Sequence, residues 1–290
     1  MSVKKAVIAV AGYGTRFLPA TKAVPKEMLS VVNKPIVQHL VEEAVQSGIE
    51  DIILVTRSGS QAISDHFDSS RELEVHLEAQ GKMDYCKIVQ DIPKLASFAF
   101  VRQARHLPYG NGTPLLAARS FINPDEPIAF MFGDDLVLSE TPCLKQLIDV
   151  YEKHQPAAVV AFQDVPREEV CHYGSPRMKP NTDPPEIEMI IEKPKPEEAP
   201  STLAQLGRFI LTPRVIDILE TMGPRTGGEL YLTDAIDILC KEHRVIAHTI
   251  EGHWHTTGDP LRYLITNVEY AVRDPDVGPG FVSYLKERFG

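Results

Sequence analysis

The feature that most constrains the fold is an apolar run near the start of the chain that ends in a glycine-rich loop. Residues 6–10 read AVIAV, which is the continuous apolar pattern of a buried strand. Residues 12–16 follow directly and read GYGTR. Glycines let backbone N–H groups approach an anion closely, and Arg16 adds a planar fork of donors. The loop favours phosphate binding, and an ordinary strand-to-loop turn is the equally simple alternative.

Two well-known phosphate loops do not fit this segment. The dinucleotide fingerprint G-x-G-x-x-G requires a third small residue, and that position is occupied by the bulky Phe17. A P-loop requires Gly-Lys followed by Ser or Thr, and the chain contains no such triplet. The loop is therefore something other than these two phosphate loops.

The segments after the loop predict an α/β fold. Asn33 is the expected N-cap of an amphipathic helix that runs to about residue 47, and residues 51–56 (DIILVT) read as a second buried strand. A strand, a helix and a strand in this order form a βαβ unit with parallel pairing. Further strands are predicted over 96–101, 127–132, 157–162, 186–192, 206–211 and 245–250, and helices over 59–84, from 115, and over 142–153, 213–220 and 230–241, with two more from 260 and 279. Since no repeat or linker marks a boundary, we expect one domain over residues 1–290, with a Rossmann-like, mostly parallel mixed sheet between helices.

Composition narrows the classes of partner. The net charge of −10 argues against nucleic acid as the main partner, because proteins bind a phosphate backbone through clustered positive charge. The four cysteines form no C-x-x-C pair, so a reducing compartment is expected. No apolar run reaches membrane-spanning length and no signal-peptide core is present. The prediction is a cytoplasmic protein that binds neither nucleic acid nor a membrane.

Polar residues follow several of the predicted strands. They are Gln103 with the glycine loop at 108–114, Asp134 in Gly133-Asp134-Asp135, and Glu192-Lys193. Ligands of such sheets collect beyond the carboxyl ends of the strands. Carboxylates beside phosphate loops are suitable Mg²⁺ ligands, although an aspartate at a strand end also serves in ordinary turns.

Several motifs resemble one family in order along nearly the whole chain. The first is AGYGTRFLPATK at 11–22 with PKEML at 25–29. The others are RQ at 102–103, the glycine loop at 110–112, GDDL at 133–136, YG at 173–174, EKP at 192–194, GR at 207–208 and GELYLTDAI at 228–236. Together they resemble bacterial UTP–glucose-1-phosphate uridylyltransferases, a branch of the sugar nucleotidyltransferases.

The resemblance implies a reaction in which UTP and glucose 1-phosphate give UDP-glucose and pyrophosphate. It also implies the nucleotide-diphospho-sugar transferase fold, Mg²⁺ bound by Asp134, and a homo-oligomer (dimer or tetramer), with the helices after about residue 260 as candidate contacts. The residues that it implies for catalysis are Arg16, Lys26, Asp134 and Lys193. For the nucleotide they are Ala11, Gly12, Gly14, Thr15, Glu27, Gln103, Gly110 and Gly112, and for the sugar Gly174, Glu192 and Glu229.

Two departures from the family pattern leave alternatives open. Thr256 stands where the family has an aspartate that faces the metal, and a hydroxyl is a weaker Mg²⁺ partner. The connection from Gln103 to Gly110 is longer than usual for the family, so either Gly110 or Gly112 is the glycine expected at the base. The alternatives are a nucleotidyltransferase that uses dTTP, or another sugar phosphate, and a weakly active paralogue that binds sugar nucleotides and regulates a partner.

Overall fold

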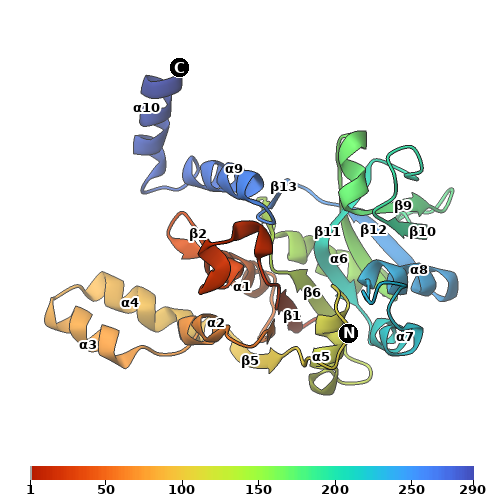
Figure 1. The fold of residues 1–290 in the computed structure, drawn as a ribbon, viewed down its shortest axis with the longest axis horizontal. Helices are drawn as coiled ribbons and strands as arrows, with labels where there is room; N and C mark the ends of the chain where they lie inside the picture. Colours follow the sequence, from red (N-terminus) through yellow and green to blue (C-terminus); the bar gives the residue numbers. More distant parts are fainter. Residues whose placement is uncertain (1) are drawn as a thin grey trace.

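The computed structural model describes residues 2–290, and its centre is a seven-stranded sheet (Figure 1). Across the sheet the strands are β12 (Val245–Thr249), β8 (Ala158–Asp164), β11 (Leu203–Leu211), β6 (Ile128–Phe132), β1 (Lys5–Val10), β4 (Asp51–Thr56) and β5 (Ser97–Arg102). Strand β11 runs antiparallel to β6 and β8, and the other neighbouring pairs are parallel. The predicted mostly parallel mixed sheet is therefore confirmed.

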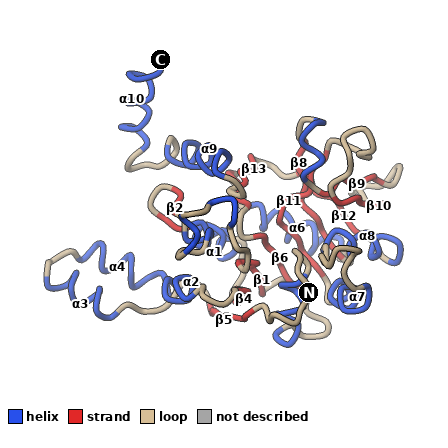
Figure 2. Tube along the Cα trace, in the orientation of Figure 1, coloured by secondary structure: helices blue, strands red, loops and turns tan. Residues whose placement is uncertain are grey.

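Helices cover both faces of this sheet, which explains why the strands are continuously apolar (Figure 2). Ile8 of β1 packs in one core cluster with α1 (Ile36–Gln46) and α6 (Cys143–His154). Its neighbour Val7 packs in the other, with α5 (Thr113–Ala118), α7 (Arg214–Met222) and α8 (Leu232–Glu242). Alternate residues of one strand thus serve opposite cores.

Three two-stranded sheets lie outside the central one. They are β2 (Ser30–Val31) with β3 (Lys34–Pro35), β9 (Gly174–Met178) with β10 (Ile187–Glu192), and β7 (Asp135–Leu138) with β13 (His253–Thr256). Of these strands, only β10 was expected from the sequence. The antiparallel register of β13 and β7 places Thr256 opposite Asp135, which joins segments far apart in the chain.

The prediction that Asn33 caps the first helix is wrong. Asn33 lies in the turn between β2 and β3, and α1 begins only at Ile36. Pro35 precedes the helix in an extended conformation (φ −62°, ψ 149°), and the hairpin pairs Val31 with Lys34. This pairing holds residue 33 outside the helix.

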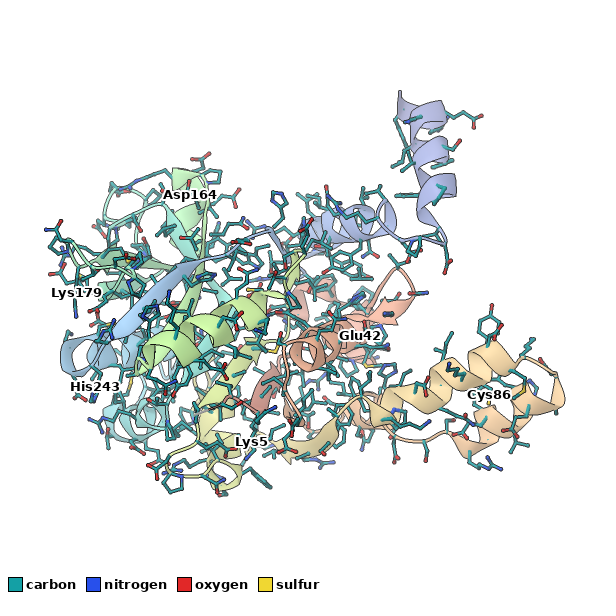
Figure 3. The ribbon with its side chains drawn as sticks, turned by 180° about the vertical axis from the view of Figure 1, so that it is seen from behind. Lys5, Glu42, Cys86, Asp164, Lys179 and His243 are labelled. Carbon is teal, nitrogen blue, oxygen red and sulfur yellow. The ribbon has the colours of Figure 1, made fainter. Side chains whose placement is uncertain are left out.

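Two helical segments project from the body of the protein (Figure 1). One contains α3 (Arg71–Ala79) and α4 (Met83–Asp91), with Cys86 buried inside this hairpin (Figure 3), and follows α2 (Gln61–His66). The other consists of α9 (Pro260–Ala271) and α10 (Gly278–Phe289). Short 3-10 helices complete the fold: η1 (Thr15–Phe17), η2 (Ala20–Lys22), η3 (Lys26–Met28), η4 (Ile92–Lys94), η5 (Arg119–Phe121) and η6 (Arg167–His172). Within residues 2–290, every helix is too short or too polar to cross a lipid bilayer.

Candidate functional site

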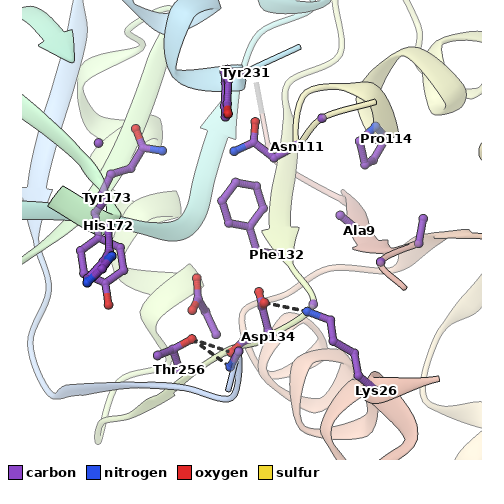
Figure 4. A pocket seen from close by; sticks show the side chains of 18 of the residues that line it. Ala9, Lys26, Asn111, Pro114, Phe132, Asp134, His172, Tyr173, Tyr231 and Thr256 are labelled. Carbon is purple, nitrogen blue, oxygen red and sulfur yellow. Dashed lines mark hydrogen bonds and ion pairs between the residues drawn. The ribbon is translucent and has the colours of Figure 1, made fainter. Parts of the chain in front are cut away.

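A cavity of about 630 Å³ lies beyond the carboxyl ends of β1, β5 and β6 (Figure 4). Its opposite wall comes from β9, the end of β10 and β13. The predicted site residues that line it are Ala11, Gly12, Arg16, Lys26, Glu27, Gln103, Gly110, Asp134, Gly174, Glu192, Lys193 and Glu229. The polar strand ends therefore converge as expected, although Glu192 belongs to the small β9–β10 sheet rather than to the central one.

Three of the predicted site residues, Gly14, Thr15 and Gly112, do not line this cavity. Gly14 has a φ of 63° and its carbonyl oxygen accepts a 2.7 Å hydrogen bond from Thr21. A Cβ on Gly112 would lie 2.7 Å from Leu219, beneath α7. Backbone conformation at Gly14 and close packing at Gly112 account for these two glycines without a ligand.

An ion pair between Lys26 and Asp134 occupies the floor of the cavity (Figure 4). The Nζ of Lys26 lies 2.6 Å from a carboxylate oxygen of Asp134. Burial raises the pKa of Asp134, but the charge and hydrogen bond of Lys26 outweigh it, so the pKa of this carboxyl is lowered overall. Arg16 lies close by and donates a 3.2 Å hydrogen bond to the carbonyl oxygen of Gly258. This end of the cavity is suited to several phosphate groups.

The two neighbouring aspartates have different surroundings. Both carboxylate oxygens of Asp135 are already engaged, by the backbone N–H of Gly207 at 2.8 Å and by the indole N–H of Trp254 at 2.9 Å. Asp134, by contrast, is bonded to Lys26 through one carboxylate oxygen, Oδ2. Asp134 is therefore the aspartate of this pair that is available to a ligand.

The hydroxyl of Thr256 faces the same region (Figure 4). It lies 3.4 Å from the main-chain oxygen of Asp134 and accepts a 3.3 Å hydrogen bond from the N–H of Gly258. Among residues 2–290, no cluster of three or more His, Cys, Asp or Glu side chains is arranged for a metal ion. One carboxylate and a hydroxyl fit an ion such as Mg²⁺, which commonly takes its remaining ligands from substrate phosphates and water.

Glu27 is a buried carboxyl at the edge of the cavity. Its side chain is 1% exposed, and neither oxygen has a hydrogen-bond partner. The Nζ of Lys26 lies 4.0 Å away. Burial raises the pKa of Glu27 to about 7, although the charge of Lys26 opposes this shift. A buried acceptor without a partner is ready to receive hydrogen bonds from a ligand.

We expect Glu27→Gln to reduce the pH dependence of folding stability. Folding raises the pKa of Glu27, so its protonated carboxyl contributes to the free energy of unfolding. That contribution is fully present below pH 4.5 and is lost as the pH rises through about 7. The ionised carboxyl then costs about 3 kcal/mol in the parent. Urea unfolding at pH 5 and pH 8 should show a smaller fall in stability for the variant. The exposed Glu197→Gln serves as control, and an unaltered pH dependence in Glu27→Gln would contradict the assignment.

The other end of the cavity carries Glu192 and Lys193. Glu192 accepts a 2.6 Å hydrogen bond from the hydroxyl of Thr233, which fixes its carboxylate. The Nζ of Lys193 lies 3.6 Å from Glu192 and 5.3 Å from the centre of the Tyr231 ring. The hydroxyl of Tyr231 donates a hydrogen bond to Glu229. A cation beside two carboxylates and an aromatic ring can bind a phosphorylated, hydroxyl-rich ligand.

The sequence analysis did not assign several residues that line the cavity. They are Ala9, Tyr109, Asn111, Pro114, Phe132, Gly133, Asp135, His172, Tyr173, Gln205, Tyr231, Trp254, Gly258, Asp259 and Arg262. Tyr109 precedes Gly110, and Tyr231 lies two residues after Glu229. Their positions in the sequence beside predicted site residues could have indicated that they line the cavity. Trp254 and Arg262 gave no local signal, because only the β7–β13 pairing and the position of α9 bring them to the site.

Comparisons with known proteins agree with this geometry. The sequence model of the family described as Nucleotidyl transferase matches residues 5–272. A UTP–glucose-1-phosphate uridylyltransferase of Staphylococcus epidermidis is 44% identical over 287 residues, covering 98% of each chain. UTP–glucose-1-phosphate uridylyltransferase 2 of Streptococcus pyogenes is 43% identical, covering 98% of this chain and 95% of its own.

Solved structures with the same fold include enzymes with nucleotides bound. A UTP-bound UDP-glucose pyrophosphorylase of Acinetobacter baumannii is 36% identical, with a TM-score of 0.87 and 99% of both chains covered. A UDP-glucose pyrophosphorylase complexed with UDP-glucose is also 36% identical, with a TM-score of 0.84, covering 94% of this chain and 100% of that one. Members of this family generally use a divalent metal ion. The resemblance seen in the sequence motifs is confirmed, and the chain belongs to the nucleotidyl transferase family.

Proposed function

We propose that this protein transfers a uridylyl group from UTP to glucose 1-phosphate and so produces UDP-glucose and pyrophosphate. The observation that supports the proposal is that one cavity holds both groups of residues. Arg16, Lys26 and Asp134 lie at one end of it, and Glu192 and Lys193 lie at the other. Such a cavity can hold a nucleoside triphosphate and a sugar phosphate side by side. Relatives 43–44% identical over almost the whole chain are named for this reaction.

In this reaction a phosphate oxygen of glucose 1-phosphate attacks the α-phosphorus of UTP in line, and pyrophosphate leaves. The protein has little covalent chemistry to perform, so positioning and neutralisation of charge dominate. We assign Lys26 to the α-phosphate, Arg16 to the departing pyrophosphate, and Lys193 to the phosphate of the sugar. Ala11 and Gly12 offer their backbone to the nucleotide, because they follow β1 at the cavity edge.

For the metal we propose Mg²⁺ held by Asp134, with Thr256 close to it. When bound, the ion would neutralise charge on the phosphate oxygens. The support is a carboxylate at the end of the cavity that also carries Arg16 and Lys26.

For the rest of the nucleotide we assign Glu27 and Gln103 to the ribose and uracil. Gly110 is favoured as the glycine beside the base, because Gly110 lines the cavity and Gly112 does not. For the sugar hydroxyls we assign Gly174, Glu192 and Glu229.

The direct test is UDP-glucose formation by the purified protein with UTP, glucose 1-phosphate and Mg²⁺. A parallel reaction with dTTP measures base preference, and higher turnover with dTTP than with UTP would overturn the uridylyl assignment. UTP binding with no UDP-glucose formed would favour the regulatory paralogue.

Lys193→Ala is expected to raise the KM for glucose 1-phosphate by ~10–100-fold, because a charge-assisted hydrogen bond to phosphate contributes roughly 1.5–3 kcal/mol. The KM for UTP should change much less, since UTP is assigned to the other end of the cavity. Initial rates with each substrate varied in turn measure this. Lys195→Ala, at an exposed position two residues further on, is the matched control. Equal effects on both substrates would contradict the assignment.

We also propose that the protein forms a homo-oligomer through α9. Its exposed face carries Leu261, Leu264, Ile265 and Val268, which are 42–68% exposed and share one side of the helix. Leu264→Lys is expected to lower the mass measured by sedimentation. Ile88→Lys, at an exposed apolar residue of α4, controls for lost surface hydrophobicity. A monomeric parent protein would contradict the proposal.

We also propose that the chain forms one domain and that the protein is cytoplasmic. A single domain over residues 1–290 is supported by strands from β1 to β12 that share one sheet. A cytoplasmic location is supported by the free thiols of Cys86, Cys143, Cys171 and Cys240.

A further inference from the structure

We infer that Arg208 is a positioning residue that fixes the direction of the Asp134 carboxylate. It acts through a set of buried hydrogen bonds made with Glu43 and Asp135, which we call the buried brace. The inference rests on the proposed function, in that Asp134 is taken as the metal ligand. It assigns a role to a charged side chain that touches neither cavity nor solvent.

Arg208 lies in β11 and is 0% exposed. Its guanidinium binds the carboxylate of Glu43, on α1, through two nitrogens at 2.9 and 2.7 Å. Removing an ion pair from water costs free energy that offsets much of the attraction between the two charges. Apolar residues of similar size often stabilise a core equally well. Stability alone therefore does not explain an arginine at this position.

One of the remaining hydrogen bonds of Arg208 reaches the segment next to Asp134, and the other stays within β11. Its Nη2 donates a 2.7 Å hydrogen bond to the carbonyl oxygen of Asp135, and its Nη1 donates one of 2.9 Å to the carbonyl oxygen of Gly207. The N–H of Gly207 in turn donates to the Asp135 carboxylate at 2.8 Å. Asp135 is thus bound to β11 through both its backbone and its side chain.

Asp134 itself lies in the tight connection between β6 and β7, where no long strand pairing holds it. Its carbonyl oxygen is held by Thr257, through the backbone N–H at 2.6 Å and the hydroxyl at 3.0 Å. Two successive carbonyl groups are therefore fixed, one by Arg208 of β11 and one by the segment after β13. With the backbone of Asp134 held in this way, its carboxylate is placed in the cavity within reach of Lys26, at 2.6 Å.

The test removes both charges of the buried ion pair together, with Arg208→Met and Glu43→Leu in one chain, because a single change leaves an unpaired buried charge. In the presence of a bound nucleoside triphosphate, Mn²⁺ affinity measured by electron paramagnetic resonance is expected to fall at least ~10-fold. Circular dichroism should show a folded protein, and nucleotide affinity without metal should change less than ~2-fold. The matched control is Lys5→Met with Glu126→Leu, a part-buried pair at the opposite end of β1.

A folded double variant with Mn²⁺ affinity within ~2-fold of the parent would overturn the inference. If the double variant does not fold, Arg208→Lys tests the same brace. It keeps a positive charge beside Glu43 but loses the planar fork that reaches both Glu43 and the Asp135 carbonyl oxygen. We expect a ~3-fold or greater loss of Mn²⁺ affinity from it, and no loss would also overturn the inference.

The proposed function is tested separately by UDP-glucose formation in the parent. If the parent makes no UDP-glucose but binds a nucleoside triphosphate with Mn²⁺, the comparison of parent and variants still decides whether the brace positions Asp134. Failure of one proposal is therefore distinguishable from failure of the other.

Discussion

Asp134→Ala is expected to lower kcat for UDP-glucose formation by ~1,000-fold or more, because the variant loses the carboxylate assigned to the metal ion. Asp134 is the aspartate of its pair whose carboxylate is available to a ligand, since both oxygens of Asp135 are bonded to Gly207 and Trp254. The measurement is the initial rate at saturating UTP and glucose 1-phosphate over a series of Mg²⁺ concentrations. The loss should not be recovered at high Mg²⁺.

The fold of this variant should be preserved, because Asp134 lies in a connection at the sheet edge and contributes little to either core cluster. Circular dichroism and the melting temperature provide that check. Asp134→Asn is the matched control, since it keeps the shape and removes the charge, and it should lose nearly as much activity. Near-normal turnover in either variant would show that the metal assignment is wrong.

Lys26→Met is expected to lower kcat by ~100–1,000-fold, the usual cost of removing one group that stabilises charge in a transition state. Its Nζ is 2.6 Å from Asp134, so it is held at the end of the cavity assigned to the triphosphate. The KM for glucose 1-phosphate should change little, because the sugar phosphate is assigned to Lys193. Steady-state rates with each substrate varied separately give both values.

Loss of Lys26 also changes the acid beside it. Lys26 is the main group that lowers the pKa of Asp134, so the variant should titrate Asp134 at a higher pH than the parent. The acidic limb of the pH–rate profile should therefore lie at higher pH in the variant than in the parent. Lys145→Met, on the exposed side of α6, is the control for removal of a lysine. Equal loss in the control variant would contradict a specific role for Lys26.

Local patterns in the sequence were sufficient for much of the fold. The apolar run of β1 and the glycine loop after it predicted a parallel α/β sheet with a ligand at its carboxyl edge, and β4 and β6 followed from the same pattern. These predictions succeeded because a buried strand must be apolar along a short continuous stretch, which is visible without any partner. Lys26 and Asp134 were proposed in the same way, as charged residues beside such elements, and both line the cavity.

Very short strands could not be found in this way, because too few residues carry the pattern. β7 and β13 are four residues each, and their strand partners are each other, across more than a hundred residues of chain. The prediction that Asn33 caps α1 was wrong for a related reason. The residues before α1 form the β2–β3 hairpin, which was not predicted from the sequence. In both cases pairing between segments outweighed local preference.

By itself, the sequence supplied the residue types that line the cavity: the glycine loop, the cations and the pair of aspartates at 134 and 135. Only the tertiary structure decided which groups can reach a ligand. It placed Gly110 in the cavity and Gly112 under α7, and it enclosed Asp135 with Arg208 in the wall. The physical reason is that residue type fixes what a side chain can bind, whereas burial and long-range hydrogen bonds fix whether it is free to do so.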